Sequence, residues 1–273
     1  MTDARRLMAV LAHPDDESLG LGGTLARCAA DGVEVVLVTA TRGESGRYRG
    51  LRRGAAGHPG PEALATIREA ELSAAARVLG VRELHLLGYR DGALDEAPPA
   101  EAVARIAHHI RAARPQVVVT FPPDGGYGHP DHIAISQFAS AAVVAAANPA
   151  HAEADLPPHA ASKLYYLAWP ERAWAAYHAA SNTPRSVVDG VTREAVPWPE
   201  WALTTVLDAR AHWPTVWEAV QCHESQVSAY EGLRDLPPGH HEALWGWQWF
   251  YRAFSTVNGG RRRETDLFEG VRA

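Results

Sequence analysis

The chain has 273 residues, 47% of them hydrophobic, which is enough to bury the core of one large domain. Its formal net charge of −6 argues against broad binding to nucleic acid or to an anionic membrane, because both need excess positive charge. The two cysteines, Cys28 and Cys222, are too few for a disulfide framework, and no apolar run approaches a membrane span. We therefore expect a cytoplasmic protein that binds neither nucleic acid nor membrane.

Strand-like and helix-like segments alternate over the first 168 residues. Short apolar runs predict buried strands at 7–12, 33–39, 83–87, 116–121 and 163–168. Helices are expected between them, at 18–30, 61–79, 99–113 and 132–147. This alternation predicts βαβ units and an α/β fold with a mainly parallel sheet. Gly22 and Gly23 lack the spacing of a dinucleotide site and predict close packing of a helix on the sheet.

Two further segments of this part carry residues that need a separate explanation. Residues 42–60 are rich in glycine and arginine and predict a long loop, of a kind that is often functional. In the helix 61–79, Glu71 falls in the middle of the apolar stripe and Arg68 lies on its flank. A carboxylate on a core-facing stripe needs a partner. Glu71 is therefore expected either to pair with Arg68 or to lie at the edge of a functional site.

The chain changes character after residue 168. All nine tryptophans lie at or after Trp169, and two helices are expected there, at 200–224 and 242–257. We predict a single domain over 1–273, with a core at 1–168 and a Trp-rich helical C-terminal extension within 169–273. The segment 245–254 can pack the core, cap a substrate site or form a subunit interface, and the last of these would make the protein a homo-oligomer.

Two clusters of histidine and carboxylate residues follow predicted strands. His-Pro-Asp-Asp-Glu at 13–17 comes directly after the first strand, and Tyr-Gly-His-Pro-Asp-His at 127–132 follows the fourth. Ligands of open α/β sheets bind outside the carboxyl ends of the strands, where the winding direction reverses. In the strand order 3-2-1-4-5, the first and fourth strands are neighbours at that point. The two clusters are therefore expected to meet in one crevice.

The residue types of these clusters suit zinc. Catalytic zinc takes three protein ligands and keeps one position for water, and two histidines with one carboxylate are a common set. His13 and Asp16 are three residues apart and can hold one face of the metal. A histidine of the second cluster, such as His132, can complete the set. The remaining carboxylate of the Asp-Asp pair is then free to take a proton from metal-bound water, whose pKa is about 7.

If His132 binds the metal, His129 is free for another task. Asp131 can then fix the tautomer of His129 and favour its protonated form. An imidazolium near the metal would stabilise a tetrahedral oxyanion and protonate a leaving amine, and Tyr127 can add a hydrogen bond to that oxyanion. Each cluster alone is also compatible with a turn or a helix start. The two together favour a catalytic centre.

The same residues resemble the motifs of a known family. Residues 12–17 with Gly-Gly-Thr at 22–24 resemble the first motif of the LmbE-like (PIG-L) deacetylases, and 127–132 are similar to the second, especially in the mycothiol-pathway deacetylase and amidase branch. Supporting matches at 41–44, at 88–91, at 223–226 and at Arg68 with Glu71 extend the resemblance over most of residues 7–226. It implies a Rossmann-like three-layer α/β sandwich that binds one zinc ion and hydrolyses N-acetyl groups, commonly on N-acetylglucosamine conjugates.

The resemblance also implies roles for single residues. His13, Asp16 and His132 match the family's zinc ligands, one ion per chain, and Asp15 matches its general base. His129 matches the residue that stabilises the oxyanion or acts as an acid.

Asp131 lies beside His129 in the same motif, and Arg68 and Asp91 resemble positions that contact the sugar. The leading hypothesis is a zinc-dependent hydrolase that removes an N-acetyl group from an N-acetylglucosamine-type conjugate, with metal-bound water activated by Asp15. An amidase that cleaves a larger acyl or thiol conjugate of a glucosamine is the alternative of the same class. A non-catalytic Rossmann-like binding module is the alternative of another class, and the intact His/Asp set argues against it.

Overall fold

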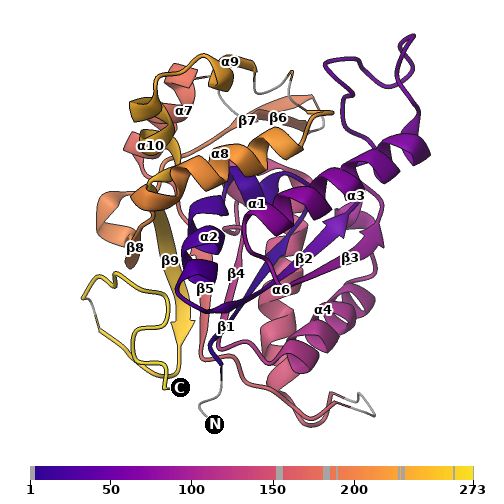
Figure 1. Ribbon diagram of the computed structural model, residues 1–273. Helices are drawn as coiled ribbons and strands as arrows, with labels where there is room; N and C mark the ends of the chain where they lie inside the picture. The colour runs from indigo at the N-terminus through magenta and orange to yellow at the C-terminus, as the bar shows by residue number, and fades with distance from the viewer. Residues whose placement is uncertain are drawn as a thin grey trace.

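The computed structural model describes residues 4–151, 156–180, 185–188, 190–226, 228, 231–260 and 262–272. At its centre lies a seven-stranded sheet with the order β3-β2-β1-β4-β5-β9-β8 (Figure 1). Its strands are β1 (Arg6–Leu11), β2 (Glu34–Thr41), β3 (Glu83–Tyr89), β4 (Val117–Thr120), β5 (Lys163–Leu167), β8 (Thr205–Asp208) and β9 (Trp247–Ser255). The first five pair in parallel, so the predicted α/β fold and the order 3-2-1-4-5 are confirmed.

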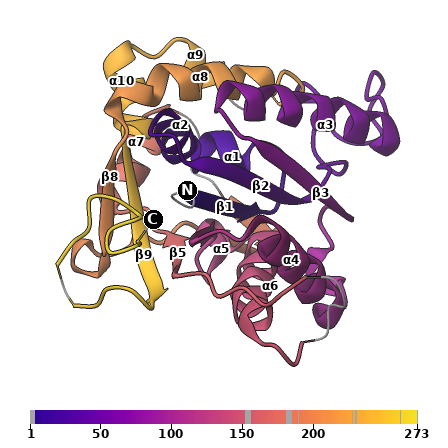
Figure 2. The ribbon, with the colours of Figure 1, turned by 60° about the horizontal axis from the view of Figure 1, so that its bottom comes forward.

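Helices cover both faces of this sheet (Figure 2). One layer contains α2 (Gly22–Ala30), α3 (Pro61–Val78) and α8 (Trp213–Cys222), and the other contains α4 (Pro99–Ala113) and α6 (Pro130–Ala147). Because both faces are covered, β1 and β4 are buried along almost their whole length, which explains their continuous apolar sequences. No helix among the described residues is long and apolar enough to cross a membrane.

Shorter elements connect these layers or extend from them. The short helices are α1 (Asp16–Leu19), α5 (Gly125–Gly128), α7 (Glu171–Ala180), α9 (Glu231–Arg234) and α10 (Pro238–Trp245). Three 3₁₀ turns are η1 (Leu94–Glu96), η2 (Glu200–Ala202) and η3 (Arg210–His212). A separate hairpin is formed by β6 (Arg185–Val188) and β7 (Val191–Glu194).

The predicted helix at 242–257 is wrong. The helix α10 ends at Trp245, and residues Trp247–Ser255 form β9, which pairs antiparallel with both β5 and β8. Aromatic side chains favour strands because they pack well on a pleated surface, and five of the nine residues of β9 are aromatic. The helix expected at 200–224 is likewise confined to α8, because β8 occupies 205–208. The C-terminal part therefore completes the main sheet as well as adding helices.

The Trp-rich segment 245–254 serves mainly as packing. Trp245 is fully buried and stacks on Trp217 and on His241, with ring centroids 6.0 and 5.6 Å apart. Trp249 is also buried, whereas Trp247 is partly exposed at the sheet edge. Of the three roles expected for this segment, core packing is the one these contacts support.

Gly23 shows why α2 begins with two glycines. A Cβ at this position would lie 2.8 Å from the carbonyl oxygen of Trp245 and 2.9 Å from Cβ of Ala209. Neither atom can move without shifting backbone. The two atoms lie at the end of α10 and directly after β8, so the close approach at Gly23 is mainly to segments that flank the sheet, with Gln248 of β9 next at 3.3 Å. We expect Gly23→Ala to lower the free energy of unfolding by about 1–3 kcal/mol. Urea denaturation measures this change, and Gly32→Ala, which has open space for a Cβ but a positive φ of 75°, separates packing from backbone strain.

A single buried carboxylate holds the segment that follows β9. Glu264 is 2% exposed and pairs with Lys163 of β5 at 2.7 Å and with Arg252 of β9 at 2.8 Å. Its oxygens also accept hydrogen bonds from Tyr165 and Thr205, at 2.6 and 2.7 Å. Side chains of three sheet strands thus converge on one residue of the C-terminal segment.

Candidate active site

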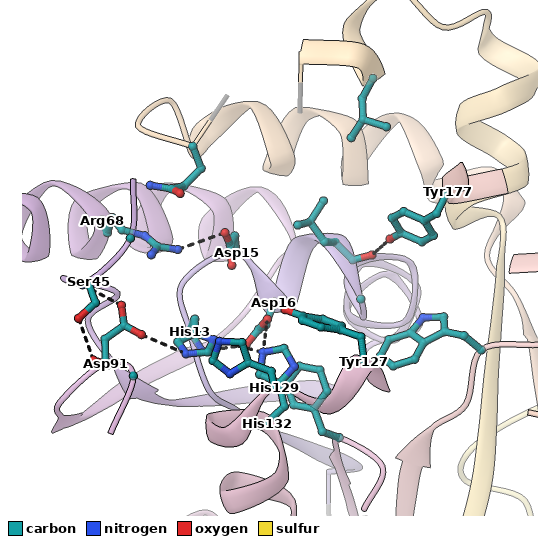
Figure 3. Close-up of a pocket in the computed structure, with 18 of the residues that line it drawn as sticks. His13, Asp15, Asp16, Ser45, Arg68, Asp91, Tyr127, His129, His132 and Tyr177 are labelled. Carbon is teal, nitrogen blue, oxygen red and sulfur yellow. Dashed lines mark hydrogen bonds and ion pairs between the residues drawn. The ribbon is translucent and has the colours of Figure 1, made fainter. Parts of the chain in front are cut away.

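Both sequence clusters meet at the carboxyl ends of neighbouring strands. β1 pairs with β4, and the residues that follow each strand line one pocket of about 500 Å³ (Figure 3). The predicted residues that line it are His13, Asp15, Asp16, Arg68, Asp91, Tyr127, His129 and His132. Asp131 is fully buried behind this wall. The expected crevice at the switch point is therefore present, and its lining contains eight of the nine predicted residues.

Three side chains of the pocket place atoms that can bind a metal close to one another. Nδ1 of His13 lies 3.2 Å from Nε2 of His132. The Asp16 carboxylate completes the triangle, at 3.6 Å from His13 Nδ1 and 3.5 Å from His132 Nε2. All three side chains are nearly buried, so water does little to screen them.

The remaining ring nitrogens decide which tautomers these histidines adopt. Nδ1 of His132 contacts the carbonyl oxygen of Gly125 at 3.1 Å, and a carbonyl only accepts, so this nitrogen carries the proton. Nε2 of His13 contacts the carboxylates of Asp131 and Asp91, at 3.0 and 3.2 Å, and must donate for the same reason. If both rings are neutral, they direct two lone pairs at each other, and this arrangement needs a positive charge between them, either a proton on Nδ1 of His13 or a metal ion.

The electrostatics of the cluster lead to the same conclusion. Burial lowers the pKa of His132 to about 3, which keeps it neutral. Burial opposes charge on His13 as well, but hydrogen bonds to Asp131, Asp16 and Asp91 raise its pKa well above the usual value. The group therefore attracts one positive charge, and the donor set of two imidazoles and a carboxylate fits a divalent metal ion.

Two overlapping groups of described side chains place their ligand atoms within 4.8 Å of one another. They are His13 with His129 and His132, and His13 with Asp91 and Asp131. In the second group, the carboxylates already accept backbone N–H bonds, Asp131 from Gly92 at 2.8 Å and Asp91 from Ser45 at 2.8 Å. These bonds fit carboxylates that orient His13 from behind better than open metal ligands.

Asp15 occupies an unusual backbone conformation at the edge of the same cluster. Its φ and ψ are 108° and −24°, a region that L-residues rarely adopt and that costs of the order of 1–3 kcal/mol. Its carboxylate lies 3.1 Å from the guanidinium of Arg68, as Figure 3 shows. Such strain persists only where neighbouring groups enforce it, so the position of this carboxylate is fixed by the fold.

Asp131 has a different partner from the one expected. Its carboxylate contacts His13, while its backbone N–H donates to Nδ1 of His129 at 3.2 Å. An acceptor at Nδ1 means that neutral His129 carries its proton on Nε2. Burial and nearby His13 lower the pKa of His129, although Asp131 opposes this. The tautomer of His129 is thus fixed by the backbone of Asp131, and its protonated form is not the favoured one.

Tyr127 lies against the two histidines of its own motif. Its ring centroid is 5.2 Å from that of His132 and 6.0 Å from that of His129. Burial strongly raises the pKa of its hydroxyl, with smaller effects from Asp16 and Asp15, so Tyr127 remains a hydrogen-bond donor.

The partners of Arg68 and Glu71 also differ from one expectation. Arg68 is almost fully buried and donates to the carbonyl oxygens of Gly43 and Pro14 as well as to Asp15. Glu71 accepts from the backbone N–H and hydroxyl of Ser225, at 2.6 and 2.7 Å. Among the described residues, Arg68 therefore pairs with Asp15 and Glu71 with Ser225, in place of the predicted ion pair between Arg68 and Glu71. Arg68 itself lines the pocket.

The sequence did not reveal an apolar wall on one side of the pocket. This wall is formed by Leu19, Trp169, Trp174, Tyr177 and Leu233. The polar groups Ser45, Arg68 and Asp91 lie on the opposite side of the histidine cluster from Tyr177 (Figure 3). The signal in the sequence that indicates this wall is the spacing of Trp169, Trp174 and Tyr177 around the start of α7.

Comparison with known proteins identifies the class. The family model GlcNAc-PI de-N-acetylase (PIG-L) matches residues 8–143. The chain is 36% identical to the 1D-myo-inositol 2-acetamido-2-deoxy-alpha-D-glucopyranoside deacetylase of Kineococcus radiotolerans, over 98% of this chain and 83% of that protein. It is also 36% identical to the deacetylase of the same name from Thermobifida fusca, over 97% and 99% of the two chains. The chain belongs to the PIG-L (LmbE-like) family, as its motifs predicted.

Solved structures with the same fold include proteins of more than one chemistry. The conserved protein TT1542 from Thermus thermophilus is 26% identical, with a TM-score of 0.65 over 95% of this chain and 98% of that one. The N,N'-diacetylchitobiose deacetylase of Pyrococcus horikoshii is 23% identical (TM-score 0.61; 82% and 71% covered). The 4-carboxy-2-hydroxymuconate hydratase GalB of Pseudomonas putida is 20% identical (TM-score 0.69; 94% and 99% covered). At these last two identities the likeness concerns the fold alone.

Proposed function

We propose that this protein is a zinc-dependent deacetylase that hydrolyses the N-acetyl group of an N-acetylglucosamine conjugate. The observation that carries the proposal is the pair of opposed ring nitrogens of His13 and His132, 3.2 Å apart beside the Asp16 carboxylate. His13, Asp16 and His132 would hold the ion. Zinc, when bound, would supply a Lewis acid and lower the pKa of coordinated water to about 7. Asp91 and Asp131 would orient His13 from behind.

The chain's own groups then have separable tasks. Asp15, held by its strained backbone and by Arg68, would take a proton from the attacking water. His129 carries its proton on Nε2 and would donate a hydrogen bond to the developing oxyanion while neutral. The Tyr127 hydroxyl, kept protonated by burial, would supply a second donor. The proton held by Asp15 would return to the leaving amine.

The polar side of the pocket favours a sugar on the amine side of the scissile bond. Arg68 and Asp91 place charged groups there, and Ser45 adds a hydroxyl. Such groups match a ring rich in hydroxyls. The relatives named above act on a 2-acetamido-2-deoxyglucopyranoside of inositol, so we propose this class of conjugate as the substrate of the present chain.

We expect the zinc-loaded protein to release acetate and a free amine from 1D-myo-inositol 2-acetamido-2-deoxy-alpha-D-glucopyranoside. A chelator should abolish the reaction, and added Zn²⁺ should restore it. Amine release is followed with an amine-reactive fluorophore, and bound metal is measured on the same samples. Near-stoichiometric zinc without amine release from this compound, N-acetylglucosamine or N,N'-diacetylchitobiose would contradict the proposal.

The apolar wall favours a second candidate of the same chemistry, an amidase for larger acyl groups. Trp169, Trp174 and Leu233 offer more apolar surface than one acetyl methyl group can cover. A series of glucosamines with N-acetyl, N-butanoyl and N-hexanoyl groups separates the two candidates within the same assay. A kcat/KM that rises along the series would favour the amidase, and one that falls would favour the deacetylase.

A further inference from the structure

Glu17, the last residue of the first motif, has no task in the mechanism above. Its side chain is fully buried, and it directly follows Asp15 and Asp16, which line the pocket. An ionised carboxylate at such a position needs hydrogen-bond donors on both oxygens. The donors that it has connect the base of the pocket to a distant part of the chain.

The two carboxylate oxygens of Glu17 have different hydrogen-bond partners. Oε1 accepts from the hydroxyl of Ser18 at 2.5 Å and contacts Nε2 of His223 at 2.8 Å. Oε2 accepts the backbone N–H of Asp15 at 3.0 Å. Because two donors fix one oxygen, the carboxylate cannot rotate freely, and the other oxygen stays on the Asp15 amide.

That amide belongs to the residue whose backbone is strained. Asp15 has a φ of 108° without being a glycine, so an external group must hold it there. The hydrogen bond from its N–H to Glu17 is such a group, and it lies on the opposite end of the residue from the Arg68 contact. Glu17 sets the backbone of Asp15, and Arg68 sets its carboxylate.

His223 is itself held firmly in place. It is fully buried directly after α8, and its Nδ1 has no hydrogen-bond partner among the described residues, so its polar contacts are directed at Glu17 and Ser18. The turn that follows is attached to α3, because Ser225 donates twice to Glu71. The ring of His223 is thus a fixed point against which the Glu17 carboxylate is oriented.

We propose that Glu17 and His223 are positioning residues for the catalytic base. His223 orients Glu17, and Glu17 holds the Asp15 backbone in the conformation that presents its carboxylate to the attacking water. This inference rests on the proposed function, in which Asp15 is the base. It predicts that damage to His223 acts on turnover through Asp15 alone.

The test is a double-mutant cycle between His223→Ala and Asp15→Asn in the zinc-loaded protein, with the inositol conjugate as substrate. Displacement of a catalytic group by about 1 Å can cost 10²-fold, so His223→Ala alone is expected to lower kcat at least about tenfold. KM and zinc content should stay within about twofold. In the Asp15→Asn background the same change should alter the residual kcat by less than about twofold, because the group it positions is already disabled.

Two further variants keep the cycle decisive. His223→Gln returns a side-chain N–H near Glu17 and should recover much of the lost turnover. Ser18→Ala removes the other donor to the same oxygen and replaces His223→Ala in the cycle if that variant does not fold. Cys222→Ala, one residue away, is the matched control and should keep wild-type kcat, because the Cys222 thiol donates to the carbonyl oxygen of Glu218.

The outcomes divide clearly. Equal losses of kcat in both backgrounds would assign His223 a general structural role and overturn the inference, as would wild-type turnover in both His223→Ala and Ser18→Ala. An inactive zinc-loaded wild type would instead overturn the proposed function.

Discussion

Asp15→Asn should lower kcat by about 10²–10⁴, the contribution typical of a general base. The amide has the shape of the carboxylate but cannot accept the proton of the attacking water. Asparagine also tolerates positive φ better than most residues, so the turn with φ of 108° at this position should survive. Zinc content should remain at the wild-type level, because His13, Asp16 and His132 are unchanged. Steady-state kinetics and metal analysis on the same preparation check both expectations.

His13→Ala provides the contrasting variant. It removes one of the two opposed imidazole nitrogens and should abolish zinc binding together with activity. Equal zinc loss in both variants would mean that Asp15 is itself a ligand, and unchanged turnover in Asp15→Asn would exclude it as the base.

The site could be predicted from sequence because its position follows from topology. Short apolar runs located β1 and β4, and the rules of parallel sheets made their carboxyl ends neighbours. Two motifs more than a hundred residues apart therefore had to meet. The residue types then limited the chemistry, since two imidazoles and a carboxylate rarely converge without a metal.

Detail within the site depended on backbone groups that no motif encodes. The Asp131 carboxylate lies on His13 because the N–H groups of Gly92 and Leu94, in the segment that follows β3, hold it there. The backbone N–H of Asp131 in turn sets the tautomer of His129. Proximity in sequence suggested an Asp131–His129 side-chain pair, but the carboxylate instead contacts the segments that follow β1 and β3.

The C-terminal part was harder to predict for a different reason. β8 and β9 join the sheet as antiparallel strands, so the alternation of strands and helices that is typical of βαβ units does not predict them. A run such as Trp-Gln-Trp-Phe-Tyr at 247–251 is compatible with a buried helix or a strand until its partners are known. The fold in turn leaves function open, because a hydratase and a deacetylase share it with this chain. The arrangement of His13, Asp16 and His132 is what favours hydrolysis.

The second large effect is expected far from the pocket. Glu264→Gln should lower the free energy of unfolding by about 3–5 kcal/mol, because it leaves the fully buried Lys163 ammonium without its carboxylate. The Tm should fall by roughly 10 °C. Removing both charges, with Lys163→Met added to Glu264→Gln, should recover part of the loss. The exposed pair of Arg172 with Glu200 is the control, since Arg172→Ala should change stability by less than about 1 kcal/mol.

The contribution of the Glu264 carboxylate to the free energy of unfolding should also depend on pH. Burial opposes its charge, but hydrogen bonds from Lys163, Tyr165, Thr205 and Asn258 lower its pKa from 4.5 to about 2. A carboxyl whose pKa is lower in the folded state stabilises the fold fully above its unfolded pKa. This contribution is lost as the pH falls from 4.5 towards 2. The stability difference between wild type and Glu264→Gln should therefore be constant at neutral pH and shrink across that acidic window in urea titrations. A difference that stays constant down to pH 2 would mean that the charge of Glu264 adds nothing to the network.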